Sequence, residues 1–543
     1  MKFRNEGRAS LAALTIAAAL ATPAMAQDAT QQQLMDRISH QDKEIEALKK
    51  QVEQLTKMMS GGAVQAAPSG KKTAASKITP EAAAATEARL NALEEKVDEQ
   101  GKVLSTRVGQ VEQKTQDGKV VMTNATPRWE SSNGNFTASL RALVQYDFGY
   151  YMQDNVPGTG TAQDLNSGSN FRRARFGVEG TLYKVWSYNF TGEWGGSGSE
   201  QPVQIQQAYI QYNGWKPFAF RVGAFSPYVS LEDSTPVGEL LFMERADATE
   251  ITRGIAGSDG RYGVSVVAQG DRYLASVAYT GSKVNGSNAA TAQTFDEQQG
   301  VVGRFAALAY SSKTANLVLG ANGSYVFDTA DTVAGPAGLG NFTFSNAPEI
   351  RVDDTGTNNA PTSLISTGAI PGRQVWHWGA DGAAQWKSLY AEGGYFKFGA
   401  TRNGEGTPAS TNPEFGAWYA QASWVITGEP HRYNAPTGSF RAPKVAHPVT
   451  LGSNGGWGAW EIAGRYSATD LNFNAGLAGR ATPAGGIRGG EQDIWTLGLN
   501  WYPNDAIRFS ANYLRINVDR LSAAGAHIGQ KVQALGIRSQ LAF

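Results

Sequence analysis

The sequence predicts an all-β protein, a 16-stranded antiparallel transmembrane β-barrel preceded by a short N-terminal coiled coil. Three observations support this: polar and apolar residues alternate along many segments, the connections between these segments alternate between short and long, and the chain opens with an export signal. A strand with lipid on one face and water on the other shows this alternation. One such hairpin also fits a soluble two-sided sheet, so the recurrence of the pattern favours the barrel.

The clearest hairpin spans residues 171–196, FRRARFGVEGTLYKVWSYNFTGEWGG. In its first strand, apolar and polar residues separate by parity: Ala174, Phe176, Val178 and Leu182 fall on one face, and Arg173, Arg175, Glu179 and Thr181 fall on the other. Its second strand places Tyr188, Phe190 and Trp194 opposite polar neighbours. Aromatic residues clustered near the turn are typical of the interfacial girdle of a membrane barrel.

The composition excludes several functional classes. The 543 residues include no cysteine, which rules out disulfides, thiolate metal sites and cysteine nucleophiles. Lys and Arg total 48, as do Asp and Glu, so no strong net charge favours a nucleic-acid partner.

Residues 1–26 are expected to be a secretory signal peptide. Lys2, Arg4 and Arg8 make a positive start, residues 11–21 are apolar, and Ala24-Met25-Ala26 offers a small-x-small cleavage site. No later segment has the 18 or so apolar residues that a spanning helix needs, so we expect an exported protein without a helical anchor.

Residues 27–60 are expected to form a short coiled coil. Two seams repeat every seven residues, the first with Leu34, Gln41, Leu48 and Leu55 and the second with Ile38, Ile45, Val52 and Met59. The alternative is a single amphipathic helix lying on the barrel. Residues 61–134 are expected to be a linker with a second helical segment at 80–116, and residues 135–543 the barrel.

From residue 136 onward the chain reads as strands and turns. The expected strands are 136–148, 171–183, 187–195, 204–213, 217–225, 261–269, 272–282, 300–311, 314–326, 374–386, 388–400, 413–427, 457–471, 491–502, 506–518 and 529–543. Short turns alternate with longer loops, which is the rhythm of periplasmic turns and extracellular loops. Residues 428–456 break this rhythm: either a hairpin is out of phase here or this is a long periplasmic turn. The last strand alternates and closes on Phe543, similar to the signal that outer-membrane barrels present to their assembly machinery.

Several separated motifs resemble the phosphate-selective porin O and P family. They are FRRARFGVEGTLYKVWSYNF from Phe171, SLEDSTPVGELLFMER (230–245), ITGEPHRY (426–433) and GAWEIAGRYS (458–467). The resemblance implies a homotrimer of 16-stranded barrels in a bacterial outer membrane, with the third loop folded into each pore. It also implies ladder arginines at Arg172 and Arg173, an aromatic residue where Arg175 stands, and a lysine in the constriction.

The sequence departs from this pattern in the third loop. Residues 226–250 contain no lysine, and their only base is Arg245. The candidate constriction residues are Glu232, Asp233, Glu239, Glu244 and Arg245. The candidate anion path on the barrel wall consists of Arg141, Arg172, Arg173, Arg175, Arg221, Arg465, Arg508, Arg515 and Arg538, and Lys397 is expected to face water as well.

We therefore expect an outer-membrane channel for small anions such as phosphate or polyphosphate, weakly anion-preferring, with both termini periplasmic. Two alternatives remain open: a general diffusion porin for small polar solutes, and an envelope tether in which the barrel is only an anchor. We expect no enzymatic activity, cofactor or metal, since the five histidines lack metal-ligand spacing and no catalytic motif has a convincing context.

Overall fold

The computed structural model describes residues 118–123, 126–153, 164–196, 203–284, 296–330, 340–353, 362–402, 412–450 and 455–543, with scattered helical positions between 47 and 106. The expected signal peptide and the expected heptad positions from Leu34 to Met59 lie outside the described residues. The chain divides into two compact units, 1–120 with 130–132 and 121–129 with 133–543.

In the first unit, the described positions from 84 to 106 are helical. Among the described residues, no helix combines the length and the apolar character needed to cross a bilayer.

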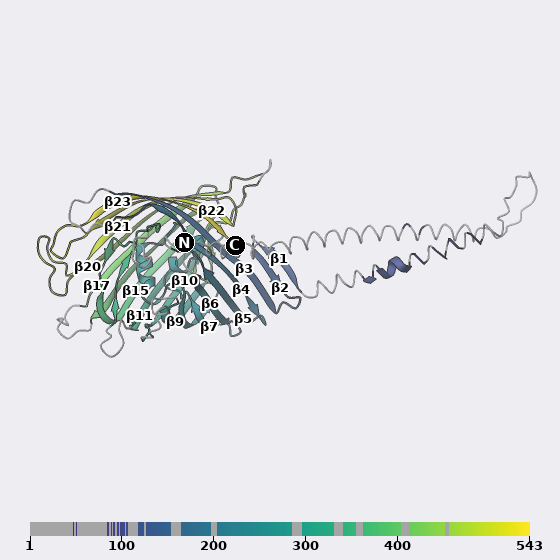
Figure 1. Cartoon of the computed structure of the whole chain (residues 1–543), viewed down its shortest axis with the longest axis horizontal. Helices are drawn as coiled ribbons and strands as arrows, with labels where there is room; N and C mark the ends of the chain where they lie inside the picture. Colours follow the sequence, from purple (N-terminus) through teal and green to yellow (C-terminus); the bar gives the residue numbers. More distant parts are fainter. Residues whose placement is uncertain are drawn as a thin grey trace, which may run out of the picture. The chain divides into compact units, whose positions relative to one another are not determined.

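The second unit is a closed antiparallel barrel, which confirms the predicted fold (Figure 1). Its 16 strands are β3 (Phe136–Gln153), β4 (Gly168–Leu182), β5 (Trp186–Glu193), β6 (Gln204–Tyr212), β7 (Phe218–Phe225), β8 (Arg261–Gln269), β9 (Tyr273–Lys283), β10 (Gln299–Ser311), β11 (Ala315–Asp328), β15 (Ile370–Trp386), β16 (Leu389–Arg402), β17 (Glu414–Val425), β20 (Ala459–Phe473), β21 (Ile487–Tyr502), β22 (Ile507–Asp519) and β23 (Gln530–Ala542). Each strand pairs with the next, and β23 pairs with β3, so the ring has no free edge.

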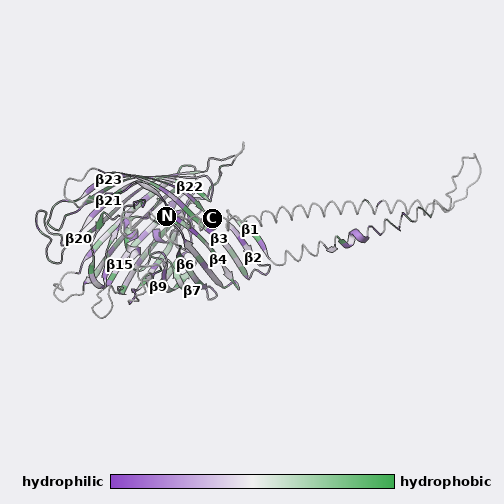
Figure 2. Ribbon diagram, in the orientation of Figure 1, coloured by the Kyte–Doolittle hydropathy of each residue, from purple (hydrophilic) through white to green (hydrophobic). Residues whose placement is uncertain are grey.

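Alternation along each strand separates the two faces of the barrel wall. In β22, Arg508, Ser510 and Asn512 are buried on the inner face, whereas Phe509 and Tyr513 are exposed on the outer face. Figure 2 shows hydrophobic and hydrophilic residues interspersed along the barrel strands. Outer aromatic rings also stack across strands: Trp460 on Trp501 and Trp501 on Phe509, each with ring centroids 5.4 Å apart.

Short and long connections leave opposite ends of the barrel. We call the end that carries the tight turns, such as 183–185 and 387–388, the short-turn end. The barrel's first residue, Phe136, pairs with Leu182 beside one of these turns, and Phe543 exchanges backbone hydrogen bonds with Ala142. Both ends of the barrel segment therefore lie at the short-turn end.

The connection 426–458 also leaves the short-turn end. β17 pairs directly with β20 in continuous register, so no hairpin is out of phase and the connection is a long one. It carries a small hairpin of β18 (Arg432–Asn434) and β19 (Ser439–Arg441).

The remaining described elements lie before the barrel or in its connections. They are β1 (Lys119–Thr123), β2 (Thr126–Glu130), α3 (Leu231–Ser234), η1 (Val237–Glu239), α4 (Asp247–Ala256), β12 (Asn341–Phe342), β13 (Ser345–Asn346) and β14 (Ile365–Ser366).

Candidate functional site

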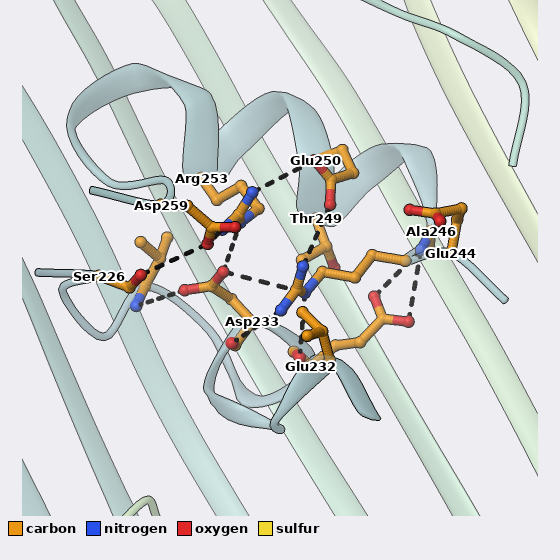
Figure 3. Close-up of polar contacts among 12 residues, drawn as sticks. Ser226, Glu232, Asp233, Glu244, Ala246, Thr249, Glu250, Arg253 and Asp259 are labelled. Atoms are coloured by element: carbon orange, nitrogen blue, oxygen red, sulfur yellow. Dashed lines mark hydrogen bonds and ion pairs between the residues drawn. The ribbon is translucent and has the colours of Figure 1, made fainter. Parts of the chain in front are cut away.

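Within the described residues, three connections fold into the barrel. The constriction loop, residues 226–260 between β7 and β8, carries α3, η1 and α4, and α4 contacts β10, β11, β15, β16, β17 and β20. The loop thus crosses from its own strands to the opposite wall (Figure 3). Residues 340–353 meet it through Glu349, and the hairpin β18–β19 meets it from the short-turn end, where Arg441 pairs with Glu239 at 2.9 Å.

A β-bulge at Arg172 brings two consecutive arginines to one acid. Gln145 pairs with Arg173 and Tyr146 pairs with Phe171, so Arg172 has no cross-strand partner and its side chain is freed from strict alternation. Arg172 Nε donates to Glu244 Oε1 at 2.9 Å and Arg173 Nη2 donates to Glu244 Oε2 at 3.1 Å. Parity alone left the direction of Arg172 open.

Arg538 makes the third contact to the same acid. Its Nη2 donates to Glu244 Oε1 at 2.8 Å and to Asp147 Oδ2 at 2.6 Å, and its Nη1 donates to the carbonyl oxygen of Met243. Three guanidinium groups from β4 and β23 therefore surround one carboxylate of the constriction loop. Burial alone would raise the pKa of Glu244, but Arg172, Arg173 and Arg538 hold it well below its usual range.

Arg465 on β20 joins the constriction loop to residues 340–353. Its fully buried guanidinium forms an ion pair with the Glu349 carboxylate. It also donates hydrogen bonds to Glu232 Oε1 at 3.4 Å and to the carbonyl oxygen of Glu244 at 3.0 Å. It also lies over the ring of Phe242, 4.5 Å from the centroid.

Two further wall arginines bind peptide oxygens of the inward segments. Arg508 donates to the carbonyl oxygens of Leu240 and Leu241. Arg304, on β10, donates to the carbonyl oxygens of Thr437 and Gly438 at 2.6 and 2.8 Å. Arg304 is not among the predicted anion-path residues, because Val302, Ala306 and Leu308 share its parity and alternation marks no polar face in this segment.

The other predicted anion-path arginines on the inner face, Arg141, Arg175 and Arg221, also have partners. Arg175 pairs with Glu193 at 2.5 Å and with Asp259 at 2.8 Å. Arg141 pairs with Glu179 at 2.7 Å and is half exposed. Arg221 donates to Gln211 and stacks on the ring of Tyr209.

Two predicted water-facing residues lie on the outer face. Arg515 shares its face of β22 with the exposed Phe509 and Tyr513, because it is an odd number of residues from Arg508. Lys397 shares its face of β16 with the exposed Tyr395 and pairs across strands with Trp378. The prediction that Arg515 and Lys397 line the pore was wrong, since no bulge in β16 or β22 resets the alternation.

Some acids of the constriction loop pair with arginines of the same loop. Arg253 Nε donates to Asp233 at 2.5 Å, and Arg253 also pairs with Glu250 at 3.4 Å (Figure 3). Arg245 pairs with Glu250 at 3.4 Å. Burial alone would raise the pKa of Glu250, but the nearby arginines, Arg253 first among them, lower it to about 2. Burial raises the pKa of Glu232 to about 8, with the neighbouring Glu392 adding to the rise.

Asp247 of the constriction loop lies beside Glu349, an acid of the inward segment 340–353. Asp247, the first residue of α4, lies against Glu349, and the Asp247 backbone N–H donates to Glu349 Oε1 at 3.3 Å. Burial and then the charge of Glu349 raise the pKa of Asp247 to about 7. Asn346 and Gln492 donate to the Asp247 carboxylate, so this site holds together two inward segments and the wall.

Acids predominate on another part of the inner wall. Glu392 accepts hydrogen bonds from the hydroxyls of Tyr390 and Tyr419, and Glu461 accepts one from Tyr502. Glu461 also meets His431 of the long connection at 2.6 Å. The described residues include no cluster of three or more His, Cys, Asp or Glu side chains placed to hold a metal ion.

A closed barrel with an apolar outer wall and a charged interior, narrowed by a loop folded inward, defines an outer-membrane channel of the porin class. The family model for phosphate-selective porin O and P matches residues 136–543. The chain belongs to this family, and the predicted resemblance is confirmed.

Two relatives match most of the chain. Porin O of Pseudomonas aeruginosa is 25% identical over 429 residues, covering 75% of this chain and 90% of that protein. An uncharacterized protein of Caulobacter vibrioides is 25% identical over 394 residues, covering 72% and 70%.

Solved structures of similar fold include two outer-membrane channels. An anion-selective porin from Comamonas acidovorans is 12% identical, with a TM-score of 0.44, and covers 75% of this chain and 100% of its own. The channel DcaP of Acinetobacter baumannii is 11% identical, with a TM-score of 0.42, and covers 76% and 99%.

Proposed function

We propose that the barrel conducts small anions such as phosphate or polyphosphate with a weak anion preference and without a tight phosphate site. One observation carries the proposal: the arginines at the constriction already meet carboxylates or peptide oxygens. Glu244 occupies Arg172, Arg173 and Arg538, and Glu232 and Glu349 meet Arg465.

Electrostatics sets the expected strength of the preference. Two unit charges about 4 Å apart interact by roughly 4 kcal/mol at an effective dielectric near 20. An acid in contact with an arginine therefore cancels much of the attraction that this arginine offers to a passing anion. The absence of lysine from residues 226–250 removes the base that the family pattern places in the constriction.

A general diffusion porin is the second candidate. The acids Asp381, Glu392 and Glu461 lie on the inner faces of β15, β16 and β20, whereas Arg172 and Arg173 lie on β4. Charges of opposite sign on different parts of a wall create a field across the pore, which sorts polar solutes by dipole and size rather than by net charge.

Planar-bilayer recording separates these functions. In a potassium chloride gradient we expect a reversal potential that shows chloride to be somewhat more permeant than potassium. We also expect micromolar phosphate not to block the chloride current. Block at micromolar phosphate would refute the weak-site proposal. Equal permeability of the two ions would favour the general diffusion porin, and absence of conductance would favour the tether.

We further propose that the protein is a homotrimer with the short-turn end, and so both termini, in the periplasm. The coiled coil expected at 27–60 and the family support the trimer, and the short turns support the orientation. We also propose that the final strand, ending at Phe543, is read by the outer-membrane assembly machinery.

A further inference from the structure

The hydrogen-bond donors around the Glu244 carboxylate are those of an oxyanion-binding site. Arg172 reaches both of its oxygens, with Nε at 2.9 Å and Nη2 at 3.1 Å, and Arg173 reaches both, at 3.3 and 3.1 Å. Arg538 adds a fifth donor at 2.8 Å. Two-pronged pairing of guanidinium with carboxylate is the strong, geometrically specific form of this interaction.

The cluster retains donor capacity for a second anion. Arg173 Nε is buried and has no hydrogen-bond partner among the described residues. A buried N–H without a partner is costly, so an incoming oxygen atom gains from satisfying it. The Arg172 side chain is 15% exposed, whereas that of Glu244 is 2% exposed, so Arg172 is the member of the cluster that a solute meets first.

Glu244 lies in an irregular segment of the constriction loop. Residues 240–246 belong to neither a helix nor a strand, and the Glu244 backbone is held by its carbonyl oxygen, which accepts from Arg465. Rotation of the side chain alone would release the three guanidinium groups while this backbone contact holds the loop.

The charge balance selects the class of anion. Arg172, Arg173 and Arg538 oppose Glu244 and Asp147, which leaves one net positive charge. The neighbouring Arg175 and Arg351 are paired with other acids, Glu193 and Glu250. A singly charged anion neutralises the cluster while Glu244 stays nearby, whereas a doubly charged anion leaves an excess negative charge in a buried site.

We propose that Glu244 is a built-in competitor in a three-arginine site, and that small monocarboxylates cross the constriction by exchanging with it. This inference rests on the proposed function because it requires a lumen that conducts solutes. The solute carboxylate takes the two-pronged contacts of Glu244 as that side chain turns away, and the return of Glu244 releases the solute.

Reversal potentials and concentration-dependent currents with acetate, sulfate and phosphate test the proposal in bilayers. The wild type should pass acetate in preference to sulfate. Glu244→Gln raises the net charge of the cluster by one and removes the competitor, so it should shift the acetate-to-sulfate permeability ratio toward sulfate by about tenfold and make sulfate and phosphate currents saturate at lower concentration. Asp328→Asn, which removes an acid from the exposed pair with Arg373, should leave the ratio unchanged.

Arg172→Gln is a second, independent variant. It leaves the cluster neutral and removes the exposed donor, so acetate passage should fall without a gain for sulfate. If the acetate-to-sulfate permeability ratio of Glu244→Gln equals that of Asp328→Asn, the proposal is wrong. If Glu244→Gln does not assemble, an acetate current in Arg172→Gln equal to that of the wild type would overturn the proposal instead. A wild type without anion preference in potassium chloride would instead refute the proposed function, even where Glu244→Gln still shifts the ratio.

Discussion

Replacing Arg465 by methionine should loosen both inward segments while the barrel stays closed. Methionine keeps the packing on Phe242 but removes the donors that meet Glu232, Glu349 and the Glu244 carbonyl oxygen. Breaking a buried ion pair from one side typically costs about 3–5 kcal/mol, because the abandoned acid stays buried. Ser467 and Thr496 still donate to Glu349, so we expect the lower end of this range.

A loss of about 3 kcal/mol shifts the docked-to-undocked ratio of the loops by roughly two orders of magnitude. Single-channel recording should therefore show larger and noisier open-channel currents in Arg465→Met, and limited proteolysis should cut residues 226–260 and 340–353 faster. Adding Glu349→Gln should restore part of the wild-type behaviour, since the uncompensated charge is then gone.

The matched control is Arg515→Met, which makes the same change on the outer face of the wall. It should leave conductance and loop proteolysis unchanged. Wild-type currents in Arg465→Met, or an equal effect of Arg515→Met, would refute the reasoning that inner-wall arginines hold the loops.

Three further predictions concern pH, selectivity and assembly. The pKa of Asp247 in the folded state, about 7, lies above the ordinary Asp value of 3.8, so between these values the native state binds a proton that the unfolded state releases. Stability should therefore fall as the pH rises from about 4 to 7. Asp247→Asn should remove this part of the pH dependence of the melting temperature in detergent. Replacing Glu232 by Gln together with Asp233 by Asn should raise the chloride-to-potassium permeability ratio measured from reversal potentials, chiefly through Asp233 at neutral pH, because the raised pKa of Glu232 keeps that group mostly protonated. An unchanged ratio would show that these acids do not act on the permeating ion. Deleting residues 27–60 should lower the melting temperature of the trimer in detergent, and an unchanged temperature would show that the heptad segment serves another role.

Alternation in the sequence was enough to predict the barrel strands, because lipid outside and charge inside impose the same two-residue period on every strand. The same period could not predict the direction of Arg172, since a bulge depends on the register with β3 rather than on β4 alone. The same period puts Arg515 on the face opposite to Arg508, seven residues before it, so the two residues cannot both face the pore in a strand without a bulge.

The pairing of charges could not be predicted from the sequence. Glu244 meets arginines 71 and 294 residues away, and Glu349 meets Arg465 across 116 residues. Such contacts depend on the path that each connection takes through the lumen, and a loop's path leaves no periodic pattern. Arg304 was missed for two reasons. Val302, Ala306 and Leu308 share its parity and are apolar, and its partners belong to a connection whose inward fold has no sequence signature.

The seam between β3 and β23 has a consequence for how the barrel is made. It joins residues near 150 to residues near 535, for example Tyr150 to Leu535, so its contacts have almost the largest sequence separation in the barrel. Until β23 arrives, β3 has an unpaired edge that invites pairing with another chain. Closure of this seam therefore has a high entropic cost among the strand pairings. Slippage by one residue there would turn the side chain of Arg538 away from Glu244 toward lipid.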